Sequence, residues 1–258
     1  MPSAHSTPLD ILAIAAHRDD VEQTCGGTLL KMSQKRQRTG VLDLTRGEMG
    51  TRGTAADRER EANEAARLMG VTWREALDIP DGRVENTFIN RLKVARVIRR
   101  TRPRVVILPY WKGRHPDHYT CSTLGYEACF LAGLKKLEIA KKLREEGMQI
   151  QQPEDELAPH RPFKIVYATL YYDVRPSFVV DISDQFEMRF AALMAYKSQF
   201  EDQQEGSGLF PAHQEIRDRV HSMARFYGML AGVKYAEPFL QKEVGLVEDL
   251  LSVPVQSI

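Results

Sequence analysis

Short apolar runs alternate with longer segments of helical pattern along this chain, and that alternation limits the folds open to it. Six runs are expected to form strands: residues 9–16, 39–44, 76–79, 104–109, 164–172 and 177–181. The segments between most of them space their apolar residues as helices do. Strand–helix–strand alternation predicts right-handed βαβ units, and hence an α/β fold with a mostly parallel sheet and helices on both faces. We expect one domain, covering residues 1–258.

The expected helices occupy six segments: residues 21–35, 54–69, 86–101, 117–137, 184–196 and 212–231. Pro103 ends the third of them, because proline cannot continue a helix. The stretch 141–162 is charged and contains proline. We expect it to be an exposed excursion rather than a linker between domains.

The charge balance of the chain argues against some classes of binding partner. Lys and Arg number 36 against 35 Asp and Glu, so the formal net charge is +1. A general nucleic-acid or anionic-membrane binder carries a marked basic excess, so neither partner is expected. None of the three cysteines lies in a CxxC pair, which argues against a disulfide framework. The apolar run Ile11–Ala16 is too short for a signal or membrane segment, and we expect a cytoplasmic protein.

Two short clusters rich in histidine and aspartate each follow an expected strand. The first is His17-Arg18-Asp19-Asp20, and the second is Arg114-His115-Pro116-Asp117-His118. In an open parallel sheet, ligands bind at the edge formed by the carboxyl ends of the strands. The two clusters are therefore expected to meet in one site.

The residue types of these clusters suit a metal. Catalytic Zn²⁺ takes three His or carboxylate ligands and keeps one position open, and the two clusters supply that number. A further carboxylate can take a proton from a bound water, and a further His can donate to an oxyanion. The alternative is structural, since an Asp just after a strand is also a common helix N-cap. Spacing alone leaves both interpretations open.

Four segments, taken in order, resemble a known family: His17-Arg18-Asp19-Asp20, Val21-Glu22, Cys25-Gly26-Gly27 and His115-Pro116-Asp117-His118. The family is that of the LmbE/PIG-L zinc-dependent N-deacetylases, and the resemblance covers nearly the whole chain. It implies a Rossmann-like parallel sheet. Three further segments resemble its bacillithiol-biosynthesis branch, which deacetylates N-acetylglucosaminyl-malate: Pro109-Tyr110, Ala195–Phe200 and Lys234–Glu237.

The resemblance assigns a metal and a base. It implies that His17, Asp20 and His118 hold Zn²⁺ and that Asp19 activates the metal-bound water. Fe²⁺ or Co²⁺ also suits such a ligand set. Where the family usually has proline or a small residue, this chain has Arg18. Arg18 must therefore point away from the metal, or it will perturb Asp19.

The resemblance also assigns the remaining roles. It implies that His115 stabilises the oxyanion or protonates the leaving amine, and that Asp117 orients His115. It further implies that Arg58 binds the substrate and that Tyr196 lies over the pocket. From its position beside His115 we infer that Arg114 also contacts substrate carboxylates, with a plain surface arginine as the alternative. A homo-oligomer, hexameric in this branch, is implied as well.

The function expected is hydrolysis of the N-acetyl group of an N-acetylglucosamine conjugate, with N-acetyl-glucosaminyl L-malate as the leading substrate and acetate as a product. One alternative is a deacetylase or amidase of another sugar conjugate, such as a chitobiose-type sugar, or of a thiol conjugate. A non-catalytic sugar-binding relative and a phosphohydrolase are the alternatives from other classes. The partner expected is thus a small-molecule sugar conjugate.

Overall fold

The computed structural model describes residues 8–150, 157–169, 173–201 and 213–255. Strands and helices alternate through its first two thirds. The elements are β1 (Ile11–Ala15), α1 (Asp20–Thr24), α2 (Gly26–Gln34), β2 (Thr39–Asp43), α3 (Ala55–Leu68), β3 (Trp73–Ala76), α4 (Phe88–Thr101), β4 (Val105–Pro109), α5 (Pro116–Ala132), α6 (Ile139–Glu145), β5 (Lys164–Ala168), β6 (Phe178–Asp181), α7 (Phe186–Met194), α8 (Lys197–Phe200), α9 (His213–Leu230), β7 (Ala236–Leu240) and a 3₁₀ turn, η2 (Leu250–Ser252).

The strands of the described residues form one seven-stranded sheet in the order β3-β2-β1-β4-β5-β7-β6. Pairing is parallel from β3 to β5, with Ile11 of β1 opposite Thr39 of β2 and Val105 of β4. Strand β7 is antiparallel to both of its neighbours. This arrangement confirms the expected α/β class and the mostly parallel sheet. The single domain over residues 1–258 stays a prediction, because its ends lie outside the described residues.

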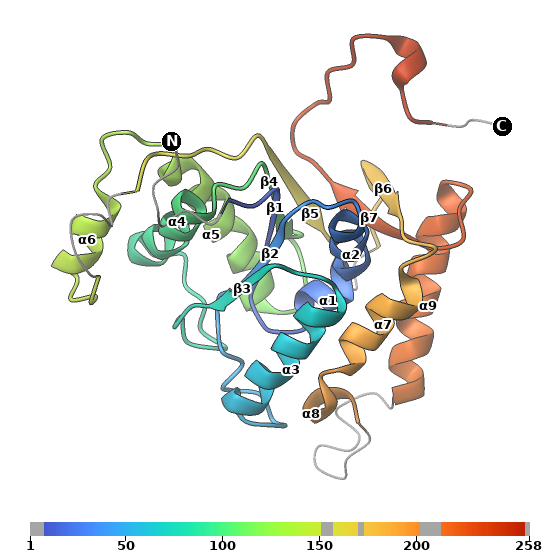
Figure 1. Ribbon diagram of the computed structural model, residues 1–258, viewed down its shortest axis with the longest axis horizontal. Coiled ribbons are helices and arrows are strands. Elements are labelled where there is room, and N and C mark those ends of the chain that lie inside the picture. Colours follow the sequence, from blue (N-terminus) through green and yellow to red (C-terminus); the bar gives the residue numbers. More distant parts are fainter. Residues whose placement is uncertain (1–7, 151–156, 170–172, 202–212, 256–258) are drawn as a thin grey trace.

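Helices cover both faces of the sheet because the central strands are apolar on both sides. Leu12 and Ile14 of β1 join a buried cluster with α4, α5 and α6. Ala13 and Ala15 point to the other face and join Leu29 of α2 in a second cluster. Figure 1 shows α4, α5 and α6 on one side of the sheet and α1, α2 and α7 on the other. Fully buried strands of this kind hold the loops at their carboxyl ends rigidly.

Several expected elements differ from the observed ones. The strand expected over 76–79 lies three residues earlier, as β3 over Trp73–Ala76. The helix expected over 21–35 is two helices, α1 and α2, which are separated at Cys25, where φ is −143°. The stretch 141–162 is not wholly an exposed excursion, because α6 extends into it and buries Leu143 against α4 and α5. Strand β7 is not among the expected strands. Glu237 and Pro238 interrupt its apolar pattern, and proline is unusual inside a sheet.

Glu237 ties this unexpected strand to the first helices. Its carboxylate is buried and accepts hydrogen bonds from the backbone N–H groups of Gly27 and Thr28, at 2.8 and 2.7 Å. It also accepts the hydroxyl of Thr28 and faces Arg189 Nε at 3.1 Å. These N–H groups begin α2, where no intrahelical acceptor exists and where the helix dipole favours negative charge. A residue of the last strand therefore caps a helix near the start of the chain.

The cysteines and the helices test two further expectations: that the chain has no disulfide framework and that it has no membrane segment. Cys25, Cys121 and Cys129 are free and buried, and burial raises the pKa of each thiol. None is poised to act as a nucleophile, since the thiolate is the reactive form. Among the described residues, no helix combines the length and the apolar character needed to cross a bilayer.

Candidate metal centre and substrate cavity

The two sequence clusters meet at the carboxyl ends of β1 and β4. These neighbouring strands lie where the sheet order reverses, since the chain passes from β1 to β2 on one side and reaches β4 on the other. Such a switch point opens a crevice for ligands. The loop after β1 carries His17 and Asp19 into α1, and the loop after β4 carries His115 into α5. The fold thus brings together residues that lie far apart in the sequence.

His17, Asp20 and His118 place three potential ligand atoms close together. His17 Nδ1 lies 3.2 Å from His118 Nε2, which lies 3.2 Å from Asp20 Oδ1. Asp20 Oδ2 is 3.6 Å from His17 Nδ1 and accepts the His17 backbone N–H at 2.9 Å. Ligands about 2.0–2.1 Å from a tetrahedral Zn²⁺ are roughly 3.3 Å apart. Each of these contacts is close to the spacing between two ligands of one such ion, with a different Asp20 oxygen facing each histidine.

The opposite edge of the His17 ring faces two carboxylates. His17 Nε2 lies 3.0 Å from Asp81 Oδ1 and 3.3 Å from Asp117 Oδ2. A proton on Nε2 satisfies these acceptors and leaves the Nδ1 lone pair for a metal, the usual arrangement of a metal-binding histidine. Without a metal, burial acts to lower the pKa of His17, but Asp117, Asp20 and Asp81 raise it to about 12, so a metal that binds Nδ1 displaces a proton from it. The sequence indicates Asp81 only as part of a turn.

Asp117 acts differently from the expectation that its side chain orients His115. Its carboxylate contacts His17 and accepts the backbone N–H groups of Gly82 and Val84, at 2.8 and 3.2 Å. The backbone N–H of Asp117 is the group that donates to His115 Nδ1, at 3.2 Å. The side chain therefore holds His17, and the main chain holds His115.

His115 is the N-cap residue of α5. Because its Nδ1 accepts a hydrogen bond, the neutral ring carries its proton on Nε2, which is then a donor. Burial lowers the pKa of His115, and charges on His17 and His118 lower it further. The His115 ring lies edge-on to His17 at 4.7 Å and is stacked on His118 at 5.0 Å between centroids. A neutral N–H donor thus stands beside the candidate metal ligands.

Asp19 is held in a strained conformation between two donors. Its φ of 99° is rare for a residue other than glycine and costs about 1–3 kcal/mol, a strain that is found at functional sites. Arg58 Nη2 and Gln23 Nε2 each donate to one of its carboxylate oxygens at 3.1 Å. Burial raises the pKa of Asp19, Arg58 opposes this, and Asp20 adds to it, which brings the value to about 7. A carboxyl group poised there suits a general base at neutral pH.

A cavity of about 580 Å³ opens over these groups. His17, Asp19, Asp20, His115 and His118 line it together with Arg58, Asp81, Arg114 and Arg219. Its size is that of a site for a small ligand.

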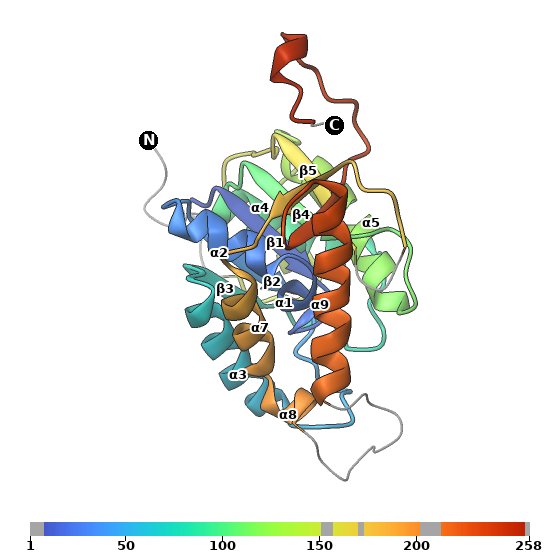
Figure 2. The same cartoon turned by 90° about the vertical axis from the view of Figure 1, so that its right-hand side faces the viewer.

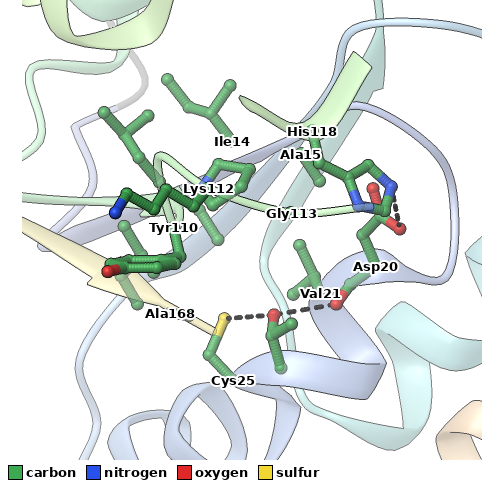
Figure 3. Close-up of a pocket in the computed structure, with 15 residues that line it drawn as sticks. Ile14, Ala15, Asp20, Val21, Cys25, Tyr110, Lys112, Gly113, His118 and Ala168 are labelled. Carbon is green, nitrogen blue, oxygen red and sulfur yellow. Dashed lines mark hydrogen bonds and ion pairs between the residues drawn. The ribbon is translucent and has the colours of Figure 1, made fainter. Parts of the chain in front are cut away.

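A second, much smaller cavity of about 30 Å³ adjoins it, and Asp20 and His118 line both. Figure 3 shows the small cavity bounded by these two residues, Val21, Cys25 and Tyr110. Most of its wall is therefore apolar, while one end is formed by the candidate metal ligands Asp20 and His118.

A family model described as GlcNAc-PI de-N-acetylase, PIG-L, matches residues 12–129. The diacetylchitobiose deacetylase of Thermococcus kodakarensis is 31 % identical over 238 residues, which are 88 % of this chain and 80 % of that relative. The chain belongs to the PIG-L family.

Solved structures agree with this PIG-L membership. A conserved protein of Thermus thermophilus is 37 % identical, with a TM-score of 0.77 over 93 % of this chain and 98 % of that one. The N,N'-diacetylchitobiose deacetylase of Pyrococcus horikoshii, solved with an inhibitor, is 27 % identical, with a TM-score of 0.74 over 89 % and 82 % of the two chains. Nothing in these matches distinguishes a bacillithiol branch.

In this PIG-L chain, two arginines connect the loop after β1, which carries His17 and Asp19, to helix α3. Arg18 points away from the candidate metal centre, as its place between ligand and base requires, and its Nη1 donates to the Ala55 carbonyl at 3.0 Å. Arg58 lines the cavity, but its Nη2 donates to the Arg18 carbonyl and to Asp19. Arg58 is thus engaged by the protein itself, whereas Arg114 is exposed at the cavity wall.

The expectation that Tyr196 lies over the pocket is wrong. Tyr196 is fully buried and does not line the cavity. Its hydroxyl donates to Glu22 Oε1 at 3.1 Å, and Arg74 donates to the same oxygen at 2.6 Å. The Arg58 guanidinium lies 5.7 Å from the centre of its ring. Tyr196 therefore supports Arg58 and α1 from within the protein.

Proposed function

We propose that this PIG-L chain is a metal-dependent N-deacetylase that releases acetate from a small N-acetylglucosamine conjugate. It is a hydrolase of linear amide bonds, in keeping with the deacetylases it resembles. The observation that carries the proposal is the convergence of His17, Asp20 and His118 on one cavity beside Asp19 and His115. Metal ligands, a base and an oxyanion donor are the groups that amide hydrolysis requires.

The metal we propose is Zn²⁺, held by His17, Asp20 and His118. When bound, it supplies a Lewis acid for the amide carbonyl and lowers the pKa of water. The carboxylates of Asp81 and Asp117 keep the His17 proton on Nε2 and so present Nδ1 to the metal. We also propose a cytoplasmic location, since free cysteines suit a reducing compartment.

Asp19 and His115 then divide the proton transfers. Asp19 takes a proton from the attacking water as the new C–O bond forms, which its pKa near 7 allows at neutral pH. His115 Nε2–H donates a hydrogen bond to the carbonyl oxygen as negative charge develops there. The C–N bond breaks when the amine nitrogen receives the proton that Asp19 took. The products are acetate and the free amine.

The small cavity beside Asp20 and His118 suits the methyl group of the acetyl unit. Its volume of about 30 Å³ is that of about one water molecule, and its wall is largely apolar. A propionyl or longer group does not fit there without movement of Val21 or Tyr110. We therefore expect kcat/KM to fall when N-acetyl is replaced by N-propionyl on the same sugar. Equal values for both acyl groups would contradict this placement.

The rest of the substrate occupies the larger cavity. We propose a second sugar, as in diacetylchitobiose, because relatives bear that name and because Arg58 is engaged by Asp19 rather than open to an anion. N-acetyl-glucosaminyl L-malate, the substrate of the bacillithiol branch, is the second candidate. The observation that favours it is the exposed Arg114 at the cavity wall, which can bind a carboxylate.

The experiment measures acetate release from both conjugates before and after removal of metal by a chelator, with re-addition of Zn²⁺, Fe²⁺ or Co²⁺. Asp19→Asn tests the base, and Asp78→Asn, an exposed carboxylate that pairs with Lys93 and does not line the cavity, is the matched control. We expect chelator-sensitive release that is lost in Asp19→Asn and kept in Asp78→Asn. Release that survives both the chelator and Asp19→Asn would refute the proposed function.

A further inference from the structure

The C-terminal arm, residues 241–255, leaves the body of the molecule after β7. In both Figure 1 and Figure 2 it projects away from the sheet and the helices. Every residue in it except Val253 is exposed. The arm is nevertheless ordered locally, since Asp249 accepts the Leu251 backbone N–H at 3.0 Å at the start of η2.

The arm is apolar as well as exposed. The exposed fractions are 97 % for Val244, 95 % for Leu246, 84 % for Leu250 and 93 % for Leu251. Apolar side chains gathered on one exposed segment mark a contact surface rather than ordinary surface scatter. Among the described residues, Val244 and Leu246 border a groove of their own chain, whereas Leu250 and Leu251 remain exposed.

The root of the arm is fixed. Lys242 Nζ lies over three aromatic rings, 4.6 Å from Tyr126, 4.9 Å from Tyr167 and 5.1 Å from Trp111 between the nitrogen and each ring centre. Cation–π contacts of this kind hold a side chain in place. The direction in which the arm departs is therefore set by the fold.

A groove suited to such an arm lies beside this root. We call it the α5 groove: a cavity of about 750 Å³ between α5, the start of β5 and residues 241–246. It exposes two aromatic side chains, Phe130 at 55 % and Phe163 at 80 %. The groove therefore offers an apolar surface against which exposed side chains such as Leu250 and Leu251 can pack.

The charges of arm and groove are complementary. The arm carries Glu243, Glu248 and Asp249 against Lys242, so 1 − 3 leaves −2. Outside the arm, the groove is lined by Arg91, Arg161 and Lys164 against Glu127, so 3 − 1 leaves +2. Complementary charge selects a partner and fixes its register.

We propose that the C-terminal arm packs into the α5 groove of a second copy of this chain. Because the groove adjoins the root of the arm on each chain, two copies related by a twofold axis exchange arms reciprocally, and both grooves are filled. This inference is independent of the proposed function. It gives the homo-oligomer expected from the sequence a specific interface.

Light scattering of the full chain during size-exclusion chromatography tests the proposal. Leu250→Asp/Leu251→Asp in the arm and Phe163→Asp in the groove are each expected to raise the dissociation constant of this chain-to-chain contact by at least about 100-fold, since each removes apolar contacts that the arm and groove make on association. Met188→Asp changes an exposed apolar residue of α7 and is the matched control. Circular dichroism verifies that all variants are folded.

A disulfide between separately made chains shows that the contact is intermolecular. Leu251→Cys chains are mixed with tagged Phe163→Cys chains under mild oxidation, while the three native cysteines stay buried. We expect a mixed disulfide between the two kinds of chain. A monomeric wild type, an oligomer unchanged by both the arm and the groove variants, or a failure of the cross-link would each overturn the proposal.

Discussion

Replacing Asp117 by Asn separates two roles for this residue. In the structure, the Asp117 carboxylate contacts His17 rather than His115, with Oδ2 lying 3.3 Å from His17 Nε2. Asp117→Asn removes the negative charge and leaves one oxygen to serve Gly82, Val84 and His17 together. Asp81 Oδ1 still accepts the hydrogen bond from His17 Nε2 at 3.0 Å, so the orientation of the His17 ring is partly kept.

The expected magnitude follows from that partial loss. A hydrogen bond to a charged group contributes about 1.5–3 kcal/mol. With Asp81 retained, we expect a loss near the lower end, about 1.5–2 kcal/mol, which is a roughly 10- to 30-fold weaker Kd for the metal. At saturating Zn²⁺ the kcat for acetate release should approach that of the wild type, because His115 is held by a backbone N–H that the substitution keeps.

The assay is a competition titration of Zn²⁺ against a chromogenic chelator, paired with acetate release at saturating metal. Asp81→Asn should raise the Kd for Zn²⁺ in the same way, and Asp78→Asn should leave it unchanged. An unchanged Kd together with a kcat that stays low at saturating Zn²⁺ would refute the reasoning. It would return Asp117 to the role of orienting His115.

Three further substitutions test the remaining assignments. His115→Ala is expected to lower kcat by about 10²–10³-fold and stability by only about 0.5–2 kcal/mol, the loss of the α5 N-cap, and near-normal kcat would exclude it as the oxyanion donor. Tyr196→Phe should destabilise the fold by about 0.5–1.5 kcal/mol, measured by urea unfolding, because Glu22 Oε1 loses one of its two donors and keeps Arg74; a raised KM with unchanged stability would place Tyr196 at the substrate after all. Arg58→Met removes the cation that opposes protonation of Asp19, so the pKa of that carboxyl rises. The base must be ionised to act, and the acid limb of kcat/KM against pH should therefore move up by about 1–3 units, with activity recovered at high pH. A limb that moves down or stays in place contradicts the pairing of Arg58 with Asp19.

The sequence is sufficient to predict the parts of the site that depend on local pattern. His17 and His115 follow buried apolar strands, and parallel pairing brings the ends of such strands to one edge of the sheet. That inference requires no knowledge of loops. It therefore places both clusters in one site from the order of residues alone.

Other residues depend on contacts that no local pattern records. Asp81 reaches His17 only because a turn after β3 folds back over the site, and a turn signal does not specify its neighbours. Tyr196 lies at helical spacing from Ala192, which predicts a face but not whether that face is buried. Strand β7 is not predicted, because Glu237 and Pro238 break its apolar alternation. The cost of burying the Glu237 carboxylate is offset by hydrogen bonds from the backbone N–H groups of Gly27 and Thr28, which are far away in the sequence.

The cap that Glu237 provides has a consequence for synthesis of the chain. The N–H group of Gly27 and its acceptor are 210 residues apart, and a ribosome adds about 5–20 residues per second. The first βα unit, which carries His17 and Asp20, thus emerges roughly 10–40 s before the carboxylate that completes α2. During that interval the nascent chain holds two candidate metal ligands without the helix anchor behind them. The anchor behind these residues is therefore completed only after β7 has been translated.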